Sequence, residues 1–198
     1  GADSAFGTVM ITCRLSVYCA RGMIGDGVQG SALWGYAIAA SGFLVAVAGP
    51  VLGAVADCYG ARKRWLAGFA GLCIVATALL WFGMPGASAG NIAFILALVV
   101  LANAGFELSL VFANAMLPHI VPAGMLGRFS GWAWAMGYGG GLVCLIFALL
   151  GLVGLGDSSP WLVLPREHSE HIRAVAPLTA LWFLLFSLPL LLFTHDMA

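Results

Sequence analysis

Charged residues are scarce in this sequence. Only 8% of its 198 residues are Asp, Glu, Lys or Arg, and eight basic side chains balance eight acidic ones. An average soluble domain is about a quarter charged. A neutral chain with so few cations has no basic patch to bind a phosphate backbone, so nucleic acid is excluded as a partner.

Paired cysteines and catalytic signatures are also missing. Five cysteines stand apart and form no CxxC pair, which argues against a zinc site or a disulfide framework. The sequence contains no Gly-x-Ser-x-Gly elbow, no HExxH motif and no Walker loop. Residues 165–171 gather His and Glu side chains, but one short charged stretch is more typical of a solvated turn than of a metal site. We expect no enzymatic activity, no metal and no cofactor.

Apolar residues dominate what is present. They make up 62% of the chain, and the mean hydropathy is +1.03. A soluble fold of this size could not hide so much apolar surface from water. The surplus must face lipid, so the bilayer is the first expected partner.

The apolar residues fall into six long runs bounded by Gly, Pro and charged residues. A bilayer core about 30 Å thick requires about 20 apolar residues per helix, and open strands would leave backbone groups unpaired in hydrocarbon. We therefore predict an all-α membrane protein, with Pro118 and Pro122 closing the fourth run. The predicted transmembrane helices span about residues 5–20, 33–56, 65–84, 92–116, 129–155 and 175–194.

Many of the glycines lie inside these runs at spacings of about one helical turn. Small residues on one face let membrane helices approach closely, and the alternative is local kinking by Gly and Pro. We favour tight packing. The glycines expected at helix contacts are Gly49, Gly131, Gly137 and Gly141.

Two ionisable residues, Arg14 and Glu107, lie deep within apolar runs. A lone charge in a membrane is costly and normally meets a partner, a cavity or a substrate. Arg14 could bind an anionic group while Glu107 holds it in place or takes up a proton, or the two could simply neutralise each other. Asn103 and Asn114 flank Glu107 and are expected to face the bundle interior. These four residues are the candidate substrate or proton pathway.

Basic residues give a weak indication of orientation. If the N-terminus is cytoplasmic, Arg62, Lys63 and Arg64 lie together in a very short cytoplasmic loop, where positive charge is favoured. Arg173 then belongs to an external loop.

The segment that ends the second run carries a recognisable motif. It reads Gly53-Ala-Val-Ala-Asp57-Cys-Tyr-Gly60-Ala-Arg62-Lys63-Arg64, which resembles the signature between helices two and three of the major facilitator superfamily. Gly53, Asp57, Gly60, Arg62 and Lys63 match, whereas Cys58 and Ala61 replace residues that are often basic. The resemblance implies a loop that latches one conformation of an alternating-access cycle.

A narrower resemblance covers almost the whole chain, carried by Asp3-Ser-Ala-Phe6, Leu33-Trp-Gly-Tyr36, Phe112-Ala-Asn114-Ala-Met-Leu-Pro118, Gly127-Arg128-Phe-Ser-Gly131 and Gly137-Tyr138-Gly-Gly140. It is similar to the vacuole-effluxer-like branch of that superfamily, the autophagy-related amino-acid effluxers, whose fungal members export amino acids from the vacuole and whose bacterial members are mostly uncharacterised permeases. The superfamily fold has two six-helix halves with substrate bound between them, and this chain resembles the N-terminal half. Arg14 and Glu107 match no known site of the branch.

The resemblance implies a secondary active or facilitative permease that moves small solutes, with amino-acid efflux as one instance, by alternating access. The alternative is a non-transporting six-helix scaffold or partner subunit. The chain begins at Gly1 without a methionine, and we expect it to be a piece of a longer protein. The expected partners are a C-terminal six-helix half or a second copy, and a small-molecule substrate. The expected location is the bacterial cytoplasmic membrane, as a multi-pass protein.

Overall fold

A computed structural model describes residues 27–59, 62–84, 86, 88–153, 161–162, 165, 167 and 169–193. This part of the chain is helical and contains no strand. The elements are α2 (Gly27–Tyr59), α3 (Arg62–Leu79), the 3₁₀ turn η2 (Leu80–Phe82), α4 (Ala89–Ile120), the 3₁₀ turn η3 (Ala123–Met125), α5 (Leu126–Ala148), the π-helical turn η4 (Leu149–Val153), α6 (Glu170–Arg173) and α7 (Val175–Phe193).

Five of these helices are long and apolar enough to cross a membrane: α2, α3, α4, α5 and the α6–α7 segment. They coincide with the last five predicted apolar runs, so the all-helical, membrane-spanning class is confirmed. The first run, 5–20, lies outside the described residues. A sixth span and the half-transporter arrangement therefore stay predictions.

Large apolar side chains cover the outside of the bundle. Phe43 of α2 is 73% exposed, Met136 of α5 is 67% exposed and Leu192 of α7 is 67% exposed. In water such a surface would be unstable, whereas in hydrocarbon it carries no penalty. The exposure pattern is that of helices surrounded by lipid.

The ends of α4 follow local rules. At the start, the side chain of Ser88 accepts a hydrogen bond from the backbone N–H of Asn91, an N-cap that satisfies one of the free donors of the first turn. At the end, Val121 is extended, with φ −114° and ψ 134°, because the residue before a proline, here Pro122, avoids the helical region. The prediction that Pro118 also closes the run is wrong, since Pro118 lies inside the helix. Membrane helices tolerate such interior prolines.

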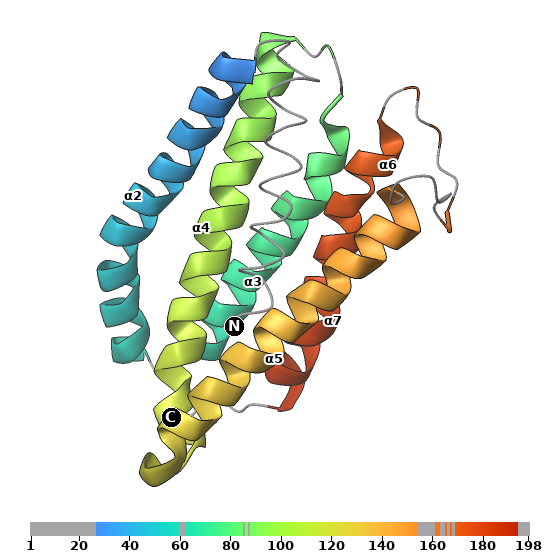
Figure 1. The fold of residues 1–198 in the computed structure, drawn as a ribbon. Helices are drawn as coiled ribbons and strands as arrows, with labels where there is room; N and C mark the ends of the chain where they lie inside the picture. The colour runs from blue at the N-terminus through green and yellow to red at the C-terminus, as the bar shows by residue number, and fades with distance from the viewer. Residues whose placement is uncertain are drawn as a thin grey trace.

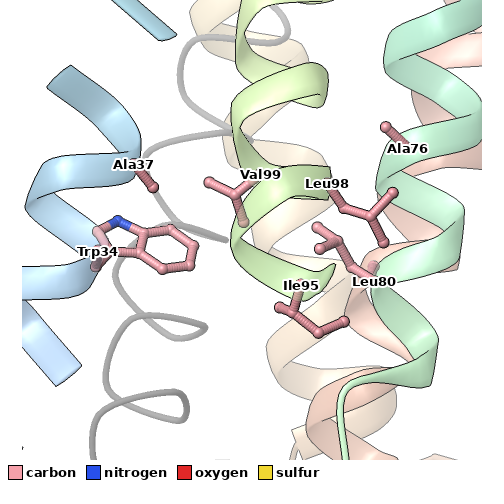
Figure 2. Packing of buried hydrophobic residues seen from close by; sticks show 8 residues of the cluster. Trp34, Ala37, Ala76, Leu80, Ile95, Leu98 and Val99 are labelled. Atoms are coloured by element: carbon pink, nitrogen blue, oxygen red, sulfur yellow. The ribbon is translucent and has the colours of Figure 1, made fainter. Parts of the chain in front are cut away.

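Helix α4 is the centre of the described bundle. It packs against α2 on one side and α3 on another, and α3 in turn packs against α7, as Figure 1 shows. Figure 2 shows one core cluster, in which Trp34 and Ala37 of α2 lie on one side of α4 and Leu80 lies on the other.

A second core cluster joins the other ends of the same helices. Ala56, Leu66 and Phe112 are buried together there. The ring of Phe112 stacks on Phe69 at a centroid distance of 5.8 Å and on Trp65 at 6.3 Å. Aromatic contacts of this kind add to the stabilisation from burial alone, so α3 and α4 are fixed at both ends of their contact.

Candidate functional site

The polar residues of α4 lie on one face of the helix. Asn103, Glu107 and Asn114 follow one another at spacings of one and two helical turns, which places their side chains on the same side. Asn103 and Glu107 are half-buried and Asn114 is exposed. The face that packs on α3, which includes the buried Ser109 and Phe112, points away from them. A polar strip thus runs along a helix that is long and apolar enough to cross the bilayer.

Asn103 is bonded to a neighbouring helix. Its Nδ2 donates a hydrogen bond of 2.8 Å to Oγ of Ser41 in α2. Ser41 is completely buried, and its own hydroxyl donates to the Ile38 carbonyl oxygen at 2.7 Å. The bond joins α2 to α4 within the membrane-spanning part of both helices, and a polar group there must find such a partner.

Glu107 has no such anchor in the described part of the chain, where no hydrogen bond or ion pair reaches its carboxyl group. Arg14, its predicted partner, lies outside the described residues. The two interpretations of Glu107, a functional carboxylate or one half of a neutral pair, therefore both stand. Asn114, two turns further along the same strip, is exposed in the described structure, so its predicted place in the bundle interior stays a prediction.

The motif between the second and third spans falls at the junction of α2 and α3. Gly53 lies in α2 with no atom within 4 Å of the position a Cβ would take. Asp57 also lies in α2, and Arg62 and Lys63 open α3 as half-buried residues. Gly60 and the Asp57 side chain are outside the described structure, so the latch role stays a prediction.

The predicted packing glycines occupy two kinds of surroundings. A Cβ on Gly49 or Gly131 would meet no atom within 4 Å. Gly137 and Gly141 are buried, together with Cys144, on one side of α5. The roles of all four in helix contacts remain predictions.

Among the glycines that the structure describes, the one with the closest neighbouring backbone is Gly105, which the sequence reasoning missed. A Cβ on Gly105 of α4 would lie 3.0 Å from the Phe69 carbonyl oxygen and 3.1 Å from the Cys73 backbone nitrogen of α3. Only a residue without a side chain permits backbones to pass so near. Gly105 and the buried Ser109 form a small-xxx-small pair, which was the signal available in the sequence.

Arg173 is a second residue whose role was not foreseen. It is only 5% exposed. Its Nε donates to the Trp81 carbonyl oxygen at 2.7 Å, a second guanidinium nitrogen donates to the same oxygen, and the guanidinium carbon lies 4.8 Å from the centre of the Trp81 ring. Arg173 lies in the short helix α6 rather than in a loop, and it binds the turn η2 that follows α3. The side of the membrane on which it lies stays a prediction. Its acceptor is a backbone carbonyl 92 residues away, and no sequence pattern indicates that.

The described part of the chain contains several apolar helices of membrane length, and one of them carries a polar strip. These features define an integral, multi-pass membrane protein with polar groups inside the bilayer. Comparison with known proteins narrows this class. A family model described as "Vacuole effluxer Atg22 like" matches residues 7–197, and the chain belongs to that family.

A relative from Bacillus subtilis (strain 168), described as "Uncharacterized MFS-type transporter YxiO", is 27% identical over 198 residues, which is 98% of this chain and 44% of the relative. The chain thus spans less than half the length of this relative. No solved structure gives a significant match. The predicted resemblance to a vacuole-effluxer-like branch of the major facilitator superfamily is confirmed, and the match is to a family of transporters rather than of enzymes.

Proposed function

We propose that this chain is the N-terminal six-helix half of a secondary active or facilitative transporter that moves small solutes, with amino-acid efflux as the specific activity, by alternating access. The observation that carries the proposal is the half-buried Glu107 on the polar strip of α4 in a chain of the effluxer family. An ionisable residue within a membrane span normally lies on an ion or substrate pathway. Substrates of such folds bind near the bilayer midplane between two halves.

The assigned roles follow from the chemistry of each group. Arg14 would bind the carboxylate of the solute, because guanidinium pairs with carboxylate in bidentate geometry. Glu107 would take up a proton during the cycle or hold Arg14 in place, and Asn103 and Asn114 would supply hydrogen bonds along the path. The loop of Gly53, Asp57, Gly60, Arg62 and Lys63 would latch one conformation.

The partner of this half would be a second six-helix half, or a second copy of the chain. The length of the Bacillus relative, of which the chain spans 44%, supports the first choice. The relative is bacterial, which favours the cytoplasmic membrane as the location.

The test is solute counterflow in proteoliposomes that contain the natural full-length protein, with a panel of radiolabelled amino acids. We expect flux of at least one of them, and a loss of ten-fold or more in Glu107→Gln and in Arg14→Gln with normal insertion and folding. The matched control is Glu167→Gln, because Glu167 is exposed in the turn before α6. Full flux in both variants would refute the assigned roles, whereas a folded protein that moves no solute would favour the scaffold alternative.

A further inference from the structure

The hydrogen bonds of Ser41 fix the orientation of the Asn103 amide. A serine hydroxyl has one proton to donate, and Ser41 gives it to the Ile38 carbonyl oxygen at 2.7 Å. Towards Asn103, the Ser41 oxygen can therefore act only as an acceptor. The amide must turn its Nδ2 to Ser41, at 2.8 Å, and its Oδ1 away.

The oxygen of the Asn103 amide, which is turned away from Ser41, shares a helix face with a second acceptor. Glu107 follows one turn later on the same face of α4, where the Cβ atoms of such neighbours are about 5–6 Å apart. An ionised carboxylate only accepts hydrogen bonds. Both side chains are half-buried, and in the described structure no donor is bonded to Glu107. The two side chains thus place several acceptor oxygens close together within the membrane, where leaving them without a donor costs free energy.

We propose that Ser41 is a positioning residue, which holds Asn103 so that its Oδ1 and the Glu107 carboxylate form a subsite for the protonated amine of a solute. The inference rests on the transport function proposed above, in the form in which Glu107 is a functional carboxylate and not the partner of Arg14. An ammonium group supplies three donors and a positive charge to a site that has oxygens and a negative charge. Anionic groups are repelled from it, so the subsite selects for amine-bearing solutes.

The competition experiment uses leucine as the probe, because its apolar side chain adds no further charged group, together with two truncated analogues of it. 3-Methylbutylamine keeps the amine and lacks the carboxylate, whereas 4-methylpentanoate keeps the carboxylate and lacks the amine. We expect the amine to inhibit the wild type through this subsite. In Ser41→Ala we expect the KM for leucine to rise about five- to ten-fold, as for the loss of one well-placed hydrogen bond. The inhibition constant of the amine should rise by a similar factor, with kcat changed by less than two-fold.

Ser109→Ala is the matched control. Ser109 is also buried and also donates to a carbonyl three residues back, at 2.7 Å from the Phe106 oxygen, but its hydroxyl reaches no other helix in the described structure. A purely structural effect would appear equally in both variants. If Ser41→Ala does not fold, Ser41→Cys replaces the hydroxyl by a slightly larger thiol, which is a weaker acceptor, and should show a smaller rise in KM. Equal effects in the Ser41 and Ser109 variants, or an amine that does not compete, would overturn the proposal.

A binding measurement separates this proposal from the transport function. The purified full-length protein is heated with 3-methylbutylamine or with 4-methylpentanoate. If the wild type moves no amino acid in the flux assay, the transport proposal is refuted, but the binding measurement still tests the subsite. The subsite is supported if Ser41→Ala needs about five- to ten-fold more amine than the wild type or Ser109→Ala for the same rise in melting temperature. It is refuted if the amine stabilises none of the three proteins, or all three equally.

Discussion

The contact of α3 with α4 at Gly105 predicts opposite outcomes for two glycine-to-alanine substitutions. A methyl group on Gly105 would lie 3.0 Å from the Phe69 carbonyl oxygen and 3.1 Å from the Cys73 nitrogen. Both are backbone atoms of a packed helix and cannot rotate aside, so the helices must separate by a few tenths of an ångström. Overpacking of this kind costs about 1–3 kcal/mol. The helix propensity gained on replacing Gly by Ala offsets about 0.5–1 kcal/mol.

The expected net effect of Gly105→Ala is a loss of about 1 kcal/mol in the free energy of unfolding. Gly68→Ala is the control, because Gly68 lies in α3 and a Cβ there meets no atom within 4 Å. That variant should be unchanged or stabilised by up to about 1 kcal/mol. The assay is denaturant unfolding of the purified protein in detergent micelles, followed by tryptophan fluorescence. If Gly105→Ala proved as stable as Gly68→Ala, the close backbone contact would be refuted.

Two further predictions concern a polar and an aromatic contact. Arg173→Ala should lower the free energy of unfolding by about 2 kcal/mol, because it removes charge-assisted hydrogen bonds to the Trp81 carbonyl oxygen. Replacing the exposed Arg128 by Ala should have little effect. Equal losses for the two variants in the same unfolding assay would contradict the role of Arg173 at this turn. Phe112→Ala should lower the free energy of unfolding by about 3–5 kcal/mol, because it empties a buried site between α3 and α4. Phe43→Ala, at a position 73% exposed, should change that free energy little. If Phe112→Ala lost no more stability than Phe43→Ala, this core cluster would not be packed as described.

The helical class and the approximate spans were predictable because apolar run length follows directly from the thickness of the bilayer. The polar strip of α4 was predictable for a related reason, since Asn103 and Glu107 are conspicuous in an apolar run. The ends of the helices were harder to predict. Pro118 was expected to end α4, but the helix continues to Ile120, because a membrane helix can accommodate a proline that a soluble one would not.

Pairings between helices were not predictable from this sequence. Hydropathy reports the free energy of transferring a residue from water to lipid, but it does not say which residue on another helix it will contact. The bond from Asn103 to Ser41 joins residues 62 apart. The acceptor of Arg173 could not be predicted, because it is a main-chain carbonyl 92 residues away. Gly105 forms a small-xxx-small pair with Ser109, but it was one glycine among 27, and the packing of α3 on α4 was needed to single it out.

The most direct test of the central claim compares the accessibility to water of two faces of α4, the polar strip and the apolar surface. Glu107→Cys and Leu101→Cys would be made in the full-length protein after replacement of its native cysteines, and treated with a membrane-impermeant thiol reagent. Both positions lie close to the middle of α4 (Ala89–Ile120), but Leu101 is on another face and is 41% exposed on the apolar surface. If the polar strip lines a solute path, the reagent labels position 107 and position 101 remains unlabelled. Equal labelling at the two positions, or none at position 107, would contradict the assignment of this strip to a transport pathway.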